Sequence, residues 1–135
     1  MPNITVPLKQ VGPTTSESTI REHHVLVDRP GAKGGNDLGP MGGELFLSSI
    51  GGCFLSNMYA AIRAREAAVS NVQAEIVGRL EGDPPRYEEI TITASGDYDD
   101  PDLFQKLVTI SERGCIMVNT LRPVLKLNVV IAQLH

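Results

Sequence analysis

The sequence predicts an α+β fold with a mainly antiparallel sheet, one long helix and a second, shorter helix. Residues 45–62 form an uncharged run that is long enough for five helical turns. Apolar and polar residues alternate over residues 72–80 and 89–95, which is the period of half-buried strands. Residues 101–114 carry apolar side chains at helical spacing, directly after an acidic residue that is suited to cap a helix.

The first half of the chain predicts two strands, a loop and the long helix. Residues 3–9 alternate as a strand does, and Pro7 places that strand at a sheet edge. Residues 23–28 form a second apolar strand, which can begin a few residues earlier. The glycine- and proline-rich stretch 29–43 is typical of a loop, and the long helix follows over about 44–66.

The second half predicts a hairpin, a helix and a last strand. Strands over 72–81 and 89–95, joined by a proline-rich turn, should pair as an antiparallel hairpin. The second helix begins with Pro101 in its first turn and ends at Gly114. One short helical turn is expected from Cys115, followed by a strand over 124–132.

Length and composition indicate a single soluble globular domain over residues 1–135. Hydrophobic residues make up 41% of the chain and charged residues 21%. The net charge of −4 and the scattered Lys and Arg residues argue against a nucleic-acid partner. The N-terminus lacks the basic start and apolar core of a signal peptide, so a cytoplasmic location is expected.

The uncharged run 45–62 is close to the lower limit for a membrane-spanning helix. It contains several serines and glycines, and no basic residues flank it on the N-terminal side. We therefore expect a buried helix of a soluble protein, packed on all sides, and no membrane partner.

Cys53 lies within this helix, directly after two glycines. Glycine inside a helix costs about 1 kcal/mol relative to alanine, so Gly51 and Gly52 suggest that space is needed beside the sulfur, for a substrate or for a crossing helix. A free buried cysteine that packs as a small hydrophobe explains the same pattern. One face of the helix carries the cysteine together with mostly small or polar residues: Phe46, Ser49, Asn57, Ala60 and Ala64.

Cys115 follows Gly114 near the start of the short helical turn, where backbone N–H groups favour a thiolate. A cysteine that merely packs at a helix corner is the alternative. Cys53 is too far into its helix for this effect, so a nucleophilic Cys53 would need a cation from elsewhere in the fold. Glu44 lies nine residues before Cys53, on the opposite side of a regular helix, so a direct contact between the two is not expected.

Metal and cofactor sites are not predicted. No run of Cys and His has zinc spacing, and the adjacent His23 and His24 point to opposite faces of a strand. In a reducing compartment, two cysteines are more often catalytic or redox-cycling than a permanent disulfide.

Two segments carry a family resemblance. "GGNDLGPMGGELFLSSIGGC", residues 34–53, resembles the reactive-cysteine segment of the OsmC/Ohr family of osmotically inducible and organic hydroperoxide resistance proteins, in its OsmC-like branch. "CIMVNTL", residues 115–121, resembles the second-cysteine segment of that family, usually Cys-Pro-Val-x-x-Thr-Leu. The predicted order of helices and strands agrees with the family along nearly the whole chain.

The resemblance implies an intertwined homodimer with the long helices at its centre and two active sites at the subunit interface. It also implies thiol peroxidase chemistry in oxidative stress defence. Cys53 would attack a peroxide and become a sulfenic acid, which would condense with Cys115 to a disulfide. An external dithiol would then reduce the disulfide, and no metal, haem or flavin takes part.

Three positions depart from the family pattern. Gly43 stands where the hydroperoxide enzymes carry an activating Glu, so Glu44 matches only the neighbouring position. The activating arginine belongs to the N-terminal region, where Arg21, reaching in from the partner chain, is the nearest candidate. Ile116 replaces the usual proline. The candidate catalytic residues are Cys53, Cys115, Arg21 and Glu44.

Two other functions fit parts of the pattern. A redox-inert dimeric module of the same fold could hold a small apolar ligand between the long helices. A cysteine hydrolase is the third interpretation, although no histidine is evidently placed to activate Cys53. Peroxide-dependent consumption of a dithiol separates the peroxidase from both.

Overall fold

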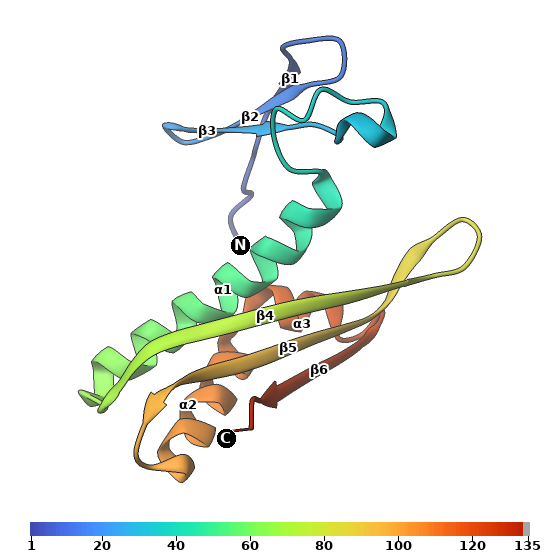
Figure 1. The fold of residues 1–135 in the computed structure, drawn as a ribbon. Helices are drawn as coiled ribbons and strands as arrows, with labels where there is room; N and C mark the ends of the chain where they lie inside the picture. Colours follow the sequence, from blue (N-terminus) through green and yellow to red (C-terminus); the bar gives the residue numbers. More distant parts are fainter. Residues whose placement is uncertain (134–135) are drawn as a thin grey trace. The chain divides into compact units, whose positions relative to one another are not determined.

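The computed structural model describes residues 1–133. The chain divides into two compact units, residues 1–46 and residues 47 onward. Each unit contains one three-stranded sheet (Figure 1). The α+β class is therefore confirmed, while the single domain expected over residues 1–135 stays a prediction.

The sheet of the first unit is antiparallel in the order β1-β2-β3. Its strands are β1 (Leu8–Gln10), β2 (Ser16–Ile20) and β3 (His23–Val27). The prediction of a strand over residues 3–9 is mostly wrong, because β1 begins only at Leu8. Before it, the Pro7 carbonyl still accepts a hydrogen bond from the Thr19 N–H at 3.1 Å.

The sequence prediction missed β2, which forms a tight hairpin with β3. Arg21 lies in the turn between them with a φ of 56°, in the left-handed region. Tight hairpins usually place glycine or asparagine at such positions. Here the turn reads Arg-Glu, so the usual signal of a hairpin is absent from the sequence.

The loop after β3 contains a short 3-10 helix, η1 (Gly31–Lys33), and leads into α1 (Gly42–Arg65). The Glu44 side chain caps the start of α1, because its Oε1 atom accepts a hydrogen bond from the Met41 N–H at 2.8 Å, which is one of the two bonds of a capping box. The prediction of the long helix is confirmed, and the helix begins two residues earlier than expected.

The sheet of the second unit has the order β4-β5-β6. The expected antiparallel hairpin is confirmed as β4 (Val69–Glu81) and β5 (Arg86–Tyr98). The last strand, β6 (Lys126–Ile131), instead pairs parallel to β5. A parallel pair needs a long crossover connection, and α2 (Pro101–Gly114) with α3 (Ile116–Leu121) supplies it.

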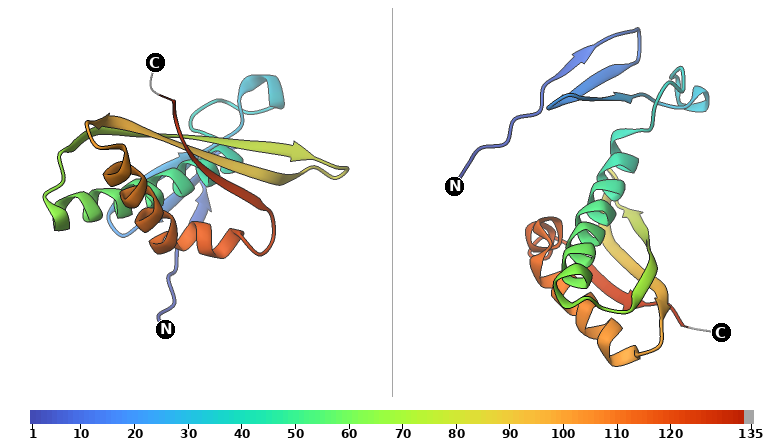
Figure 2. Two further views of the ribbon diagram at one scale, coloured as in Figure 1. Left: turned by 90° about the horizontal axis from the view of Figure 1, so that it is seen from below. Right: turned by 90° about the vertical axis from the view of Figure 1, so that its left-hand side faces the viewer.

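Within the second unit, α1, α2 and α3 lie on the same face of the sheet (Figures 1 and 2). The hydrophobic core lies between this helical layer and β5. The α1 side chains in the core follow a spacing of four residues, which forms one stripe along the helix. Fully buried core side chains include Ile50, Phe54, Met58, Ile90, Ile92, Phe104 and Leu107.

The expectation that the long helix is packed on all sides is wrong for the single chain. Only 28% of the most apolar 18-residue window of α1 is buried. By length and composition this helix could span a membrane, with a mean hydropathy of 1.4, but core helices of soluble proteins pass the same test. The exposed side of α1 includes Ser48, Gly52, Ser56 and Tyr59.

The two glycines before Cys53 differ in their surroundings. A Cβ atom on Gly51 would lie 3.0 Å from Cγ1 of Ile76 on β4, whereas a Cβ atom on Gly52 would have no neighbour within 4 Å. Gly51 therefore allows α1 to approach the sheet. The space beside Gly51 is filled by β4 and is not available to a substrate or a crossing helix, whereas the space beside Gly52 is open in the single chain.

This difference predicts different effects of alanine at the two positions. Gly52→Ala should raise the free energy of unfolding by about 1 kcal/mol through helix propensity. Gly51→Ala should be less stable than Gly52→Ala by about 1–3 kcal/mol, because its methyl group overpacks against Ile76. Urea unfolding of both variants measures the difference, and equal stabilities would contradict the close packing of Gly51.

Candidate functional site

The two cysteines meet in the second unit, although they are far apart in the sequence. Cys53 lies in the middle of α1, and Cys115 lies at the corner between α2 and α3. The two side chains are close enough to interact directly. Both are free thiols; Cys115 is completely buried, and Cys53 is partly exposed. The site therefore offers one sulfur that solvent reaches and one that it does not.

The backbone at Cys115 explains its position. Cys115 is the N-cap of α3 with extended backbone angles, and its N–H donates to the Glu112 carbonyl at 3.4 Å. Ile116 is the first helical residue and is 69% exposed. Helices accept proline readily at this first position, so isoleucine in place of the family's usual proline is compatible with the same helix start.

Burial raises the pKa of the Cys115 thiol above its ordinary value. The interaction with the Cys53 side chain and negative charge on that neighbour raise the pKa further, while the N–H groups of Val118 and Met117 oppose the change. The expected influence of a helix start on Cys115 therefore exists, but burial outweighs it. Burial therefore favours the neutral thiol form of Cys115.

Asn57 lies one helical turn after Cys53 and contacts both cysteine segments. Its Nδ2 donates to the Cys53 carbonyl at 2.9 Å and lies 4.0 Å from the Cys53 sulfur. A Cβ atom on Gly114 would lie 2.9 Å from Asn57 Oδ1. The sequence placed Asn57 on the face of Cys53 but gave it no role; its spacing of four residues was the available signal.

Arg21 and Glu44 belong to the first unit, whereas the cysteines belong to the second. Arg21 is exposed at the β2–β3 turn, and the Glu44 carboxylate caps α1. Catalytic roles for these two residues stay predictions. Arg122, an arginine of the second unit, is paired with Glu112 at 2.6 Å.

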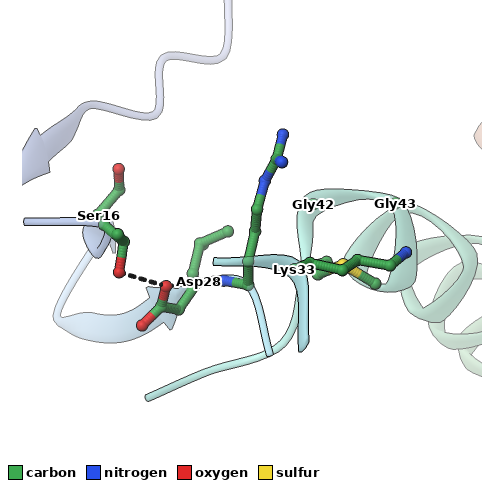
Figure 3. Close-up of a pocket in the computed structure, with 9 residues that line it drawn as sticks. Ser16, Asp28, Lys33, Gly42 and Gly43 are labelled. Carbon is green, nitrogen blue, oxygen red and sulfur yellow. Dashed lines mark hydrogen bonds between the residues drawn. The ribbon is translucent and has the colours of Figure 1, made fainter. Parts of the chain in front are cut away.

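The first unit contains a polar pocket of about 460 Å³ (Figure 3). Hydroxyl, acidic and basic side chains surround it, together with the first residues of α1. The pocket is lined by Thr14, Ser16, Val27, Asp28, Arg29, Lys33, Met41, Gly42 and Gly43. The charged side chains of Asp28, Arg29 and Lys33 would be desolvated without a polar partner by a purely apolar ligand, which disfavours such a ligand here.

Asp28 holds this part of the chain together. Its carboxylate accepts hydrogen bonds from the hydroxyls of Thr14 and Thr15, each at 2.9 Å. It also accepts from the backbone N–H groups of Arg29 at 2.7 Å and Leu38 at 3.2 Å. Burial acts to raise the pKa of Asp28, but these four hydrogen bonds outweigh it and lower the pKa to about 2.

The lowered pKa of Asp28 predicts a specific loss of stability in acid. A depressed pKa in the folded state stabilises the fold above the ordinary value of 3.8, and this contribution disappears as the pH falls toward 2. Asp28→Asn should therefore lower the Tm at pH 7 and flatten its dependence on pH between 4 and 2. Calorimetry of the full chain measures both effects. Asp37→Asn in the same loop is the control, and an unchanged pH profile in Asp28→Asn would contradict the assignment.

Potential metal ligands are not clustered in the part of the chain that the structure describes. Residues 1–133 contain no group of three or more His, Cys, Asp or Glu side chains that could hold a metal ion. His24 lies at the surface, with its Nδ1 atom 3.5 Å from the Glu17 carboxylate.

Among known protein families, one family model matches most of the chain. The family model for OsmC-like proteins matches residues 34–130. An OsmC-like protein from Mycoplasma pneumoniae has the same fold, with a TM-score of 0.85, 16% identity and 99% of each chain covered. A comparison with curated proteins found no significant match.

Two structures of organic hydroperoxide resistance proteins are also similar in fold. The one from Legionella pneumophila has a TM-score of 0.74 and 16% identity, over 96% of this chain and 97% of that chain. The one from Elizabethkingia anophelis has a TM-score of 0.72 and 17% identity, over 96% of each chain. At these identities the likeness shows the fold alone.

Proposed function

Because this chain belongs to the family of OsmC-like proteins, we propose that it is a thiol-dependent peroxidase acting in oxidative stress defence. The substrates are organic hydroperoxides or hydrogen peroxide, as the names of the Legionella and Elizabethkingia proteins suggest. One observation carries the proposal: a partly exposed Cys53 lies beside a buried Cys115 and interacts with it.

The proposed cycle has three steps. The Cys53 thiolate attacks one peroxide oxygen, the O–O bond breaks, and the alcohol or water leaves after taking up a proton. The resulting sulfenic acid is attacked by the Cys115 sulfur, which forms a disulfide and releases water. An external dithiol then reduces this disulfide by thiol–disulfide exchange and is itself oxidised.

The different environments of the two sulfurs support this assignment of roles. Cys53 is the sulfur that a dissolved peroxide can reach, while Cys115 is completely buried. The raised pKa of Cys115, caused first by burial, keeps that thiol protonated while Cys53 reacts. Within the proposal, Arg21 of the partner subunit is the cation that favours the Cys53 thiolate, and Glu44 at the start of α1 assists.

A homodimer in the cytoplasm is part of the same proposal. The exposed side of α1 is uncharged from Leu45 to Ile62, which is unusual for a helix surface in contact with water. A second copy of the chain would cover it. Light scattering that gave a stable monomer of 14.6 kDa would contradict the dimer.

The same exposed face of α1 favours one alternative function, a redox-inert binding module for a small apolar ligand. In that case a ligand would copurify with the protein and peroxide would not oxidise Cys53. The polar pocket at Asp28 is not a candidate site for such a ligand.

Peroxide-dependent consumption of a dithiol tests the proposed function directly. Reduced protein is mixed with hydrogen peroxide or with a bulky organic hydroperoxide in a stopped-flow instrument, and dithiol loss is followed under turnover. The peroxidase should consume one dithiol per peroxide and form an intramolecular disulfide. Dithiol loss no faster than without protein would favour the binding module.

A further inference from the structure

Asn57 is the side chain that links the two cysteine segments. Its carboxamide nitrogen is bonded to the Cys53 carbonyl at 2.9 Å and faces the Cys53 sulfur at 4.0 Å. Its carboxamide oxygen lies against Gly114, the residue directly before Cys115. An asparagine side chain has two N–H donors, so the carbonyl and the sulfur can each be given one.

We propose that Asn57 is a positioning residue of the Cys53–Cys115 pair, which directs a neutral N–H group at the Cys53 sulfur and holds the Gly114 segment in contact with α1. The inference rests on the proposed function in taking Cys53 as the reacting sulfur. It adds a residue that neither the family motifs nor the sequence pattern assigned.

The geometry supports this role in two ways. The bond to the Cys53 carbonyl fixes the carboxamide in one orientation, so its second N–H is held toward the sulfur. A donor directed at sulfur stabilises the charged thiolate more than the neutral thiol. Cys115 is the titratable group that contacts Cys53 from the α2–α3 corner, and its buried thiol remains protonated.

Gly114 supports the role of Asn57 from the other side. The predicted Cβ position at Gly114 is 2.9 Å from Asn57 Oδ1, which is closer than atoms normally approach. Any side chain at residue 114 would therefore displace the carboxamide. The absence of a side chain there allows Asn57 to span the space between α1 and the end of α2.

The test is the pH profile of Cys53 alkylation by iodoacetamide, followed by mass spectrometry of the Cys53 peptide in the full chain. Asn57→Asp keeps the shape of the side chain but replaces the donor by a negative charge. Its alkylation midpoint should rise by about one pH unit, which is about a tenfold loss of rate at pH 7. Asn57→Ala removes the donor without adding charge and should slow alkylation about threefold.

Two further variants separate this role from a general effect on stability. Gln105→Glu adds the same charge at an exposed position of α2, outside the face of α1 that the proposed dimer would cover, and should stay within about twofold of the parent protein, because exposed charges are screened. Gly114→Ala leaves Asn57 in place but pushes its carboxamide away, so it should shift the profile in the direction of Asn57→Ala. If Asn57→Asp does not fold, Asn57→Ala and Gly114→Ala decide the question.

Profiles for Asn57→Asp and Asn57→Ala that coincide with that of Gln105→Glu would overturn the inference. Because iodoacetamide reports the thiolate without any peroxide, this result is independent of catalysis. A protein whose Cys53 is alkylated as expected but is not oxidised by peroxide would refute the proposed function and leave the role of Asn57 standing.

Discussion

Cys53→Ser is expected to abolish peroxide consumption, lowering the rate by about 10³-fold or more, as is usual when a catalytic nucleophile is removed. The serine hydroxyl is not ionised at neutral pH and cannot form a sulfenic acid. The substitution is nearly isosteric at a partly exposed position, so the fold should be retained. Stopped-flow mixing of the reduced variant with hydroperoxide measures the loss.

The control for Cys53→Ser is Gln105→Cys in the same variant, which restores a thiol at an exposed position of α2, outside the face of α1 that the proposed dimer would cover. This thiol should not restore the rate, because it lacks the neighbouring Cys115 and Asn57. Equal single-turnover rates for Cys53→Ser and the parent protein would refute the assignment and point to Cys115 as the attacking sulfur.

Cys115→Ser is expected to separate oxidation from turnover. Cys53 should still be oxidised once by peroxide at close to the parent rate. Without the second sulfur the sulfenic acid persists or oxidises further, so steady-state dithiol consumption should fall by about 100-fold. A sulfenic acid trap and mass spectrometry would detect the oxidised Cys53 in this variant, and undiminished turnover would contradict the resolving role of Cys115.

In the parent protein, the disulfide-forming step should accelerate as the pH rises. Burial raises the pKa of Cys115, so only a small fraction of this thiol is ionised near neutral pH. Below that pKa, the thiolate fraction, and with it the rate, increases about tenfold per pH unit. Oxidation of Cys53 also removes the negative charge that raises the pKa of Cys115. The attack of Cys115 on the sulfenic acid should therefore be faster than the raised pKa of the reduced protein implies.

The elements with a clear period were predictable from the sequence. The long helix, the hairpin of β4 and β5 and the second helix each carry an apolar pattern that their own residues determine. Asp100 illustrates this, because its side chain accepts from the N–H groups of Asp102 and Leu103 as a helix cap does. The two cysteine segments also identified the family before any geometry was known.

The strands of the first unit were harder to predict. β1 is only three residues long, and the turn between β2 and β3 lacks glycine and asparagine. In the sequence, Asp28 is only the polar last residue of a predicted strand. Its role could not be predicted, because its hydrogen bonds come from Thr14, Thr15 and Leu38, which are distant in the sequence. No periodic pattern signals such contacts.

By itself, therefore, the sequence determined the α+β class, the helix that carries Cys53 and the choice of Cys53 and Cys115 as candidate reactive residues. Only the tertiary structure decided that the two thiols are in contact, that β6 runs parallel to β5, and that Gly51 serves the packing of α1 on β4. The physical reason is that local patterns report which face of a helix or strand is apolar. Contacts such as that of Asn57 with Gly114 arise only when α1 and α2 pack together.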